Sequence, residues 1–69
     1  MNFGQAIEAL KAGNSTSRAG WNGKNMKIFL ETRDGFEPCL VLINAAGGKQ
    51  PGWNASTPDV LAEDWGVVA

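Results

Sequence analysis

Apolar residues near the N-terminus recur at the spacing of an α-helix, which brings positions three and four apart onto one face. They are Phe3, Ala6, Ile7 and Leu10. Asn2 precedes them as a helix cap, and Gln5, three residues later, completes a capping-box pattern. Gly13 is suited to end the helix. The pattern predicts a helix over about residues 3–12 whose apolar face packs on a sheet.

The middle of the chain changes to the period of two that is typical of β-strands. Met26, Ile28 and Leu30 alternate there with Lys27, Phe29 and Glu31. The alternation predicts a half-buried strand, and residues 15–18 are predicted to pair with it through a two-residue Asn22-Gly23 hairpin turn. Residues 39–43 form a continuous apolar run, which favours a central strand buried on both faces.

The last third of the chain predicts shorter elements. Residues 49–54 form either a short strand or an extended loop. Thr57 is suited to cap a short helix over residues 58–62, with a proline at its first position. Residues 65–68 are predicted as a last strand, at an edge of the sheet or against its centre. The predicted fold is α+β, with an N-terminal helix packed on a small antiparallel sheet and a short second helix before the last strand.

The length of the chain limits how it can be stabilised. Residues 1–69 are expected to form a single ligand-binding domain. A domain of this size buries only about 60 % of the surface of its unfolded chain, and it usually needs a disulfide, a metal or a partner subunit. The chain has one cysteine and no histidine, which excludes an internal disulfide and argues against the usual zinc sites. No metal or cofactor is expected, and association into a homo-oligomer is the remaining source of stability.

The charges are few and unevenly placed. A formal net charge of −1 argues against a nucleic-acid polymer as the partner, because such polymers bind basic surfaces. Residues 11–27 contain four cations and no acid, whereas residues 59–64 contain three acids and no base. A local basic patch on a nearly neutral chain favours a small anionic ligand. The sequence shows no signal peptide and no transmembrane stretch, so a cytoplasmic protein without a membrane partner is expected.

The stretch from Arg18 to Lys24 carries candidate ligand-binding chemistry. Trp21 offers a flat face for stacking on a base, or else fills the core beneath the hairpin. Arg18 either clamps a diphosphate with its planar fork of donors or is a solvated surface cation. Asn22 either contacts a ribose or base edge or serves only the turn. Lys24 is a weaker candidate, because a single point charge beside a turn is usually solvated.

A second group of candidate residues lies around Trp53. This tryptophan has no apolar residues just before it, so its ring is expected to be partly exposed, and it either forms a second wall of the pocket or has no contact with the ligand. Asn54 and Ser56 supply polar groups beside the ring. Asp59 either accepts hydrogen bonds from ribose hydroxyls or stabilises the start of the short helix through the helix dipole. Trp65 begins a strand pattern and is expected in the core or in an interface.

Several groups of residues together resemble one protein family. They are the Met-Asn-Phe-Gly start with its Ala6 and Leu10 helix, the Arg18-x-Gly20-Trp21-Asn22-Gly23 motif, Trp53 with Ser56, and the Asp-Val-Leu-Ala-Glu-Asp-Trp run from Asp59 to Trp65. In this order and at this length, they make the chain similar to the phage Thoeris anti-defense 2 family. The resemblance covers residues 1–32 and 50–69.

The resemblance implies a homotetramer with pockets between its protomers. It implies a sponge that binds a cyclic ADP-ribose-type signal, such as a glycocyclic ADP-ribose isomer, made by bacterial Toll/interleukin-receptor-domain enzymes. Some members of the family are thought to hold cyclic dinucleotides as well. Such a protein acts in the cytoplasm of the infected bacterial host, where it silences the downstream effector. Many relatives carry a longer insert where residues 44–52 form a short turn, which leaves the ligand open.

The residues of the chain do not predict catalysis. Cys39 lies in an apolar run that disfavours a thiolate, and the carboxylates of Asp59, Glu63 and Asp64 have no evident metal-binding partners. Binding without cleavage is therefore expected. The alternative is a small protein–protein interaction module that inhibits a host factor, which only the acidic Glu63-Asp64 corner favours.

Overall fold

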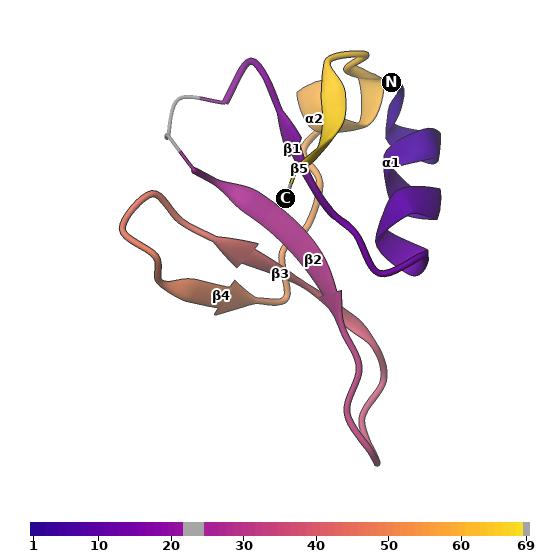
Figure 1. The fold of residues 1–69 in the computed structure, drawn as a ribbon, viewed down its shortest axis with the longest axis vertical. Helices are drawn as coiled ribbons and strands as arrows, with labels where there is room; N and C mark the ends of the chain where they lie inside the picture. Colours follow the sequence, from indigo (N-terminus) through magenta and orange to yellow (C-terminus); the bar gives the residue numbers. More distant parts are fainter. Residues whose placement is uncertain (22–24, 69) are drawn as a thin grey trace.

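The computed structural model describes residues 1–21 and 25–68, and it shows two helices and an antiparallel five-stranded sheet (Figure 1). The elements are α1 (Phe3–Lys11), β1 (Ser15–Arg18), β2 (Lys27–Glu31), β3 (Cys39–Ile43), β4 (Lys49–Pro51), α2 (Thr57–Leu61) and β5 (Trp65–Val68). The strands lie in the order β4-β3-β2-β1-β5, and each neighbouring pair is antiparallel. This arrangement is consistent with the predicted α+β class.

Helix α1 forms where the apolar period predicted it. The Asn2 side chain accepts a hydrogen bond from the Gln5 backbone, and the Gln5 side chain accepts one from the Asn2 backbone, so the predicted capping box is present. Ala6 and Leu10 are buried, and Gly13 follows the helix with a φ of 97°, which suits glycine. The helix contacts β1, β5 and β2, so it covers one face of the sheet.

The hydrophobic core lies between α1 and this face of the sheet. Its buried members are Ala6, Leu10, Ile28, Leu42 and Trp65. Ile28 of β2 pairs with Leu42 of β3, and Thr16 of β1 pairs with Ile28, so these three positions point to the same side. The core is thus drawn from both ends and the middle of the chain.

The opposite face of the sheet carries a different set of residues, which we call the open face. Lys27 and Ile43 form one cross-strand pair of this face, and Lys49 of β4 continues it. Phe29, Val41 and Pro51 form the next row, again in register across β2, β3 and β4. Val41 is only 2 % exposed, although α1 lies on the other side of the sheet.

Two predictions about the strands need correction. Residues 39–43 are an interior strand with Val41 and Leu42 buried on opposite faces, but β2 is the central strand because β5 adds to the sheet beyond β1. The first hairpin is not tight, since β1 ends at Arg18 and β2 begins at Lys27. The Asn22-Gly23 turn itself lies outside the described residues.

The structure also settles the C-terminal third. Of the two alternatives for residues 49–54, a short strand forms at Lys49–Pro51. β5 lies at an edge of the sheet, beside β1. The prediction that Thr57 caps α2 is wrong by one residue: Ser56 is the cap, because its hydroxyl accepts from the Asp59 backbone N–H. No helix within the described residues is long and apolar enough to cross a membrane.

Thr16 is a fully buried polar residue whose hydroxyl lacks a hydrogen-bond partner among the described residues. A buried hydroxyl without a partner loses its hydration and gains nothing in return. We therefore expect Thr16→Val, which keeps the shape and removes the polar atom, to raise the free energy of unfolding by about 1 kcal/mol.

The measurement is denaturant unfolding at a fixed protein concentration. Thr16→Ser is the matched control: it keeps the hydroxyl and loses a buried methyl, so it should lower the free energy of unfolding by about 1 kcal/mol. A Thr16→Val variant less stable than wild type would show that the hydroxyl has a partner.

Candidate functional site

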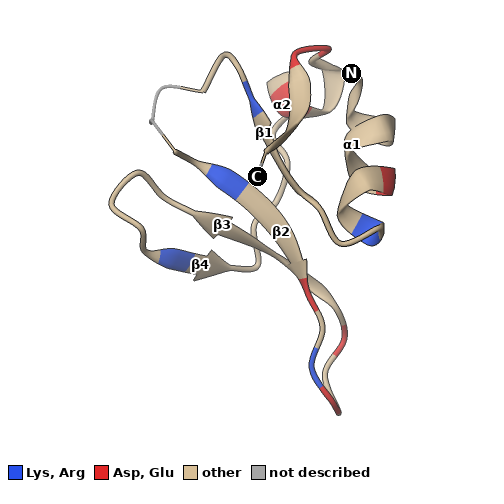
Figure 2. Cartoon of the chain, viewed as in Figure 1, with Lys and Arg blue, Asp and Glu red and all other residues tan. Residues whose placement is uncertain are grey.

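Arg18 lies at the end of β1 and joins three segments of the chain. Its Nε donates to Oδ1 of Asp64 at 2.8 Å, and its Nη1 donates to Oδ1 of Asp59 at 2.8 Å. These bonds hold the pKa of the guanidinium above its ordinary value, with the bond to Asp64 contributing most. Figure 2 shows the positive end of β1 beside negative segments at α2 and just before β5. The charge of Arg18 is therefore balanced by two carboxylates.

Asp59 is the buried carboxylate of this cluster, with 9 % of its surface exposed. Burial raises its pKa, but the hydrogen bonds that it accepts from Arg18, Trp21 and Ser56 outweigh this effect and hold the pKa below its ordinary value. Oδ1 accepts from the Trp21 indole N–H at 3.1 Å as well as from Arg18, and Oδ2 accepts from the Ser56 backbone at 3.3 Å. Both oxygens thus have partners within the chain.

Asp64 holds the segment that follows β1. One oxygen binds Arg18, and the other accepts from the Gly20 backbone N–H at 2.8 Å. A Cβ added to Gly20 would lie 3.0 Å from that oxygen, so a larger residue here would have to displace the carboxylate slightly. The hydrogen bond from Arg18 is the main reason that the pKa of Asp64 is lowered. The two motifs of the sequence, Arg-x-Gly-Trp and Asp-Trp, therefore bind one another.

Three tryptophans pack beside this cluster. Trp21 lies edge-on to Trp65 at 5.3 Å between ring centroids and to Trp53 at 6.1 Å. Trp65 is 3 % exposed and also packs against Phe3, which confirms its predicted place in the core. Its indole N–H donates to the Asp59 carbonyl at 2.9 Å. Trp21 and Trp53 are partly buried, so each keeps some surface for a ligand.

An open cleft of about 950 Å³ lies next to Trp21. Its walls come from the end of β1, the start of β2, the turn between β3 and β4, and the end of β5. The described lining residues are Ser17, Arg18, Ala19, Trp21, Asn25, Met26, Lys27, Ile43, Asn44, Ala45, Ala46, Gly47 and Val68. By strand alternation Ser17, Lys27, Ile43 and Val68 point to the open face, so the cleft opens on the side opposite α1.

The structure places some of the predicted site residues in the lining of the cleft and others outside it. Arg18 and Trp21 line the cleft. Trp53 and Asp59 contact Trp21 but do not line the cleft, and Ser56 caps α2. Asn54 is exposed and likewise lies outside the described lining. Asn22 and Lys24 lie outside the described residues.

Sequence reasoning missed the wall formed by the turn at residues 44–47. Asn44 holds this turn, because its side-chain oxygen accepts from the Ala46 and Gly48 backbone N–H groups at 3.0 and 2.8 Å. The Asn-Ala-Ala-Gly-Gly run from Asn44 to Gly48 is a recognisable turn signal, but no local feature shows that the turn faces the cleft. Lys27 was also missed, although the alternation of β2 places it on the same face as Ile43.

The described lining of the cleft includes aromatic, cationic and polar side chains. Among the described lining residues there is no carboxylate, thiol or imidazole. The part of the chain that the structure describes also contains no group of three potential metal ligands. An indole face, a lysine and several amide groups line the cleft, and they suit a ligand with both flat and polar parts.

The fold and the site define a small α+β protein with an open cleft supported by an ion-paired and aromatic corner. The chain belongs to the Thoeris anti-defense 2-like family, whose domain model matches residues 1–68. It is 42 % identical to Thoeris anti-defense 2 of Bacillus phage SP01, over an alignment of 85 residues that covers 100 % of this chain and 96 % of the relative. The resemblance inferred from the motifs is thereby confirmed. The relative carries residues that this chain of 69 residues lacks.

The Arg18–Asp59–Asp64 cluster makes stability depend on acid pH. Both aspartates have a lower pKa in the folded chain than in the unfolded chain. Their stabilising effect is complete above the ordinary aspartate pKa of about 3.9 and is lost as the pH falls through the lowered folded values. We expect the thermal unfolding midpoint to fall from about pH 4 downwards, which calorimetry at a series of pH values measures.

Two variants separate this cluster from the other carboxylates. Asp64→Asn should lower the midpoint at neutral pH and flatten its dependence on acid pH. Glu8→Gln should behave like wild type, because the Glu8 side chain is 75 % exposed and its ion pair with Lys11, at 3.5 Å, is a surface pair. The same acid dependence in wild type and Asp64→Asn would contradict the assignment.

Proposed function

We propose that this protein counters Thoeris defence by binding a cyclic nucleotide immune signal and holding it intact. The signal is a cyclic ADP-ribose-type molecule, such as a glycocyclic ADP-ribose isomer, or a cyclic dinucleotide. Membership of the Thoeris anti-defense 2-like family carries the anti-Thoeris part of the proposal. The cleft beside Trp21 supports the binding part, because its volume of about 950 Å³ lies at the upper end of the range found for small-molecule sites, roughly 300–1,000 Å³.

Trp21 is the residue that we assign to the base of the ligand. It lines the cleft, and its indole N–H is fixed by Asp59, so the ring is held in one orientation. A preoriented ring loses little entropy when a base stacks on it, and such stacking contributes roughly 1–3 kcal/mol. Trp53 packs against the edge of Trp21 and keeps it in place, which is how it supports the site.

The phosphates need positive charge or backbone donors, and Lys27 in the wall of the cleft can supply the charge. Arg18 also lines the cleft, but two of its nitrogens bind Asp59 and Asp64, and Nη2 takes part in neither bond. We therefore propose that the main role of Arg18 is to hold Trp21 and its segment in place. Its Nη2 is the nitrogen that we propose donates to a ligand. Asn54, Ser56 and Asp59 then act from outside the cleft, and Asn22 and Lys24 are proposed ligand contacts beyond the described residues.

The proposal also includes self-association. A chain of 69 residues has a small core, and the family resemblance implies a homotetramer with pockets between protomers. The open face is the broad surface of the sheet that α1 does not cover, and the cleft opens on it. A second copy on this face would close the cleft from outside. The protein would act in the cytoplasm of the infected host cell, where the signal is made.

The direct test is to mix the purified protein with the cyclic signal and measure depletion of the signal from solution. The protein is then denatured by heat, and the supernatant is analysed by mass spectrometry. We expect recovery of the intact signal in a fixed ratio to protein, because the described lining of the cleft contains no carboxylate, thiol or imidazole for cleavage. A cleaved product that grows with time would show catalysis, and absence of depletion would favour a protein-blocking role.

Blocking the cleft tests its location. Ala46→Trp adds a large ring to the exposed turn that forms one wall, so it should abolish depletion without changing the unfolding midpoint by more than a degree or two. Ala12→Trp is the matched control, because Ala12 is exposed at the end of α1 and lies outside the lining. Trp21→Ala should also abolish depletion, but it removes ring contacts and a hydrogen bond and will lower stability too. Full depletion by Ala46→Trp would place the site elsewhere.

A further inference from the structure

The hairpin between β2 and β3 holds a phenylalanine at its exposed tip. The ring of Phe36 is 67 % exposed, and the Arg33 guanidinium lies over it at 4.9 Å from the ring centroid. Arg33 is itself paired with Glu31 at 3.3 Å. The Phe36 backbone N–H donates to the Arg33 carbonyl across a tight turn in which Gly35 has a φ of 80°. The ring is therefore fixed in an exposed position.

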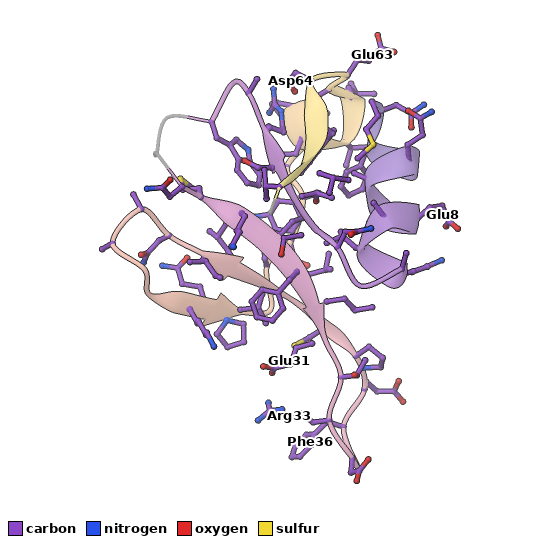
Figure 3. All side chains as sticks on the ribbon, viewed as in Figure 1. Glu8, Glu31, Arg33, Phe36, Glu63 and Asp64 are labelled. Atoms are coloured by element: carbon purple, nitrogen blue, oxygen red, sulfur yellow. The ribbon has the colours of Figure 1, made fainter. Side chains whose placement is uncertain are left out.

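The hairpin projects well beyond the rest of the sheet (Figure 1). Figure 3 shows Glu31, Arg33 and Phe36 on the side of the hairpin that faces away from α1. This is the side of the open face, where Glu31 and Cys39 form the last cross-strand pair before the loop. Phe36 thus extends the open face beyond the end of the paired strands.

The open face carries an apolar row opposite α1, in which Val41 is buried, Phe29 is partly exposed and Pro51 is exposed. The row is formed by Phe29, Val41 and Pro51 in register, and the Lys49 ammonium lies 6.0 Å from the centre of the Phe29 ring. The exposed ring of Phe36 lies on the same side of the protein as the surface that Phe29 and Pro51 leave accessible, and apolar surface of this kind is typical of an interaction surface.

We propose that the open face docks a second copy of this chain, with Phe36 of each copy seated on the Phe29–Val41–Pro51 row of the other. The proposal rests on the self-association put forward above, and it names the surface and the residue that carry it. Phe36 and the Phe29–Val41 pair lie on the same β2–β3 ribbon, and Pro51 of β4 flanks that pair. A two-fold axis through the ribbon therefore brings each tip onto the row of the other copy, and such a contact joins two protomers of the larger assembly.

The charges of the two parts are complementary. The tip carries the acids Asp34 and Glu37, and the row is bordered by Lys27 and Lys49 (Figure 2). Glu31, near the middle of the ribbon, is paired with Arg33 of its own chain. Two copies in antiparallel arrangement place acids of one tip beside a lysine of the other row, which favours this pairing over one with the tips together.

The position of the two-fold axis gives a direct probe. Along the ribbon the Glu31–Cys39 pair lies between the Phe36 tip and the Phe29–Val41 pair, and Cys39 is three residues from Phe36 and two residues from Val41. The axis should pass near this pair, so the Cys39 thiols of the two copies should lie close together. Cys39 is the single cysteine of the chain and is partly exposed. A short thiol-specific cross-linker can therefore join two copies only through this residue.

The experiment measures cross-linking of Cys39 by a short bis-maleimide, together with sedimentation over a series of protein concentrations. Wild type should give a covalent dimer in high yield. Phe36→Ser should raise the dissociation constant roughly tenfold or more, the loss expected for an interface anchor, and reduce the cross-linked yield in parallel. Leu61→Ser is the matched control, because Leu61 is a similarly exposed apolar residue, at 74 %, on α2. It should leave both measurements unchanged.

The possible outcomes distinguish a wrong interface from a wrong proposed function. Oligomers without Cys39 cross-links, or a Phe36→Ser variant that assembles like wild type, would overturn this interface. A monomeric wild type would overturn it together with self-association. Depletion of the cyclic signal by wild type is measured separately and tests the proposed function. If wild type depletes the signal but Phe36→Ser assembles like wild type, only the proposed interface is wrong. Phe36-dependent assembly without depletion means that only the sponge is wrong.

Discussion

The two hydrogen-bonded ion pairs of Arg18 are the interaction on which the rest of the structure depends. They join the end of β1 to α2 and to the segment before β5, residues that are 41 and 46 positions away in the chain. Asp59 then holds the Trp21 indole and Asp64 holds the Gly20 backbone, so the segment leading to the cleft is fixed from both carboxylates. Removing one member would leave a partly buried charge without its partner, which costs more than the pair itself contributes.

Local patterns were sufficient for most of the secondary structure. The capping box of α1, the alternation in β2 and the apolar run of β3 each depend on residues within a few positions of one another. The errors came where tertiary contacts decide. Ser56 caps α2 in place of Thr57, and β1 ends at Arg18 because the chain turns there: Trp21 donates to the Arg18 carbonyl and Ala19 donates to the Asp64 carbonyl.

The candidate site was harder to predict, for an electrostatic reason. The sequence suggested a basic patch near Arg18 and a separate acidic corner near Asp64, and the fold brings the two into contact. A count of charges along the chain cannot show such cancellation, because the partners are far apart in sequence. Trp21 was identified from its motif and does line the cleft, whereas the turn at residues 44–47 gained its place in the cleft only through the pairing of β2 with β3.

The packing of the indoles has a spectroscopic consequence. All three tryptophans of the chain touch one another, with centroids between 5.3 and 6.3 Å apart, and the chain has no tyrosine. Its ultraviolet emission therefore originates from a single corner, in which excitation passes between rings before it is emitted. Because Trp21 in that corner also forms a wall of the cleft, the protein carries its own optical reporter, whose signal has no background from tyrosine or from a tryptophan elsewhere in the chain.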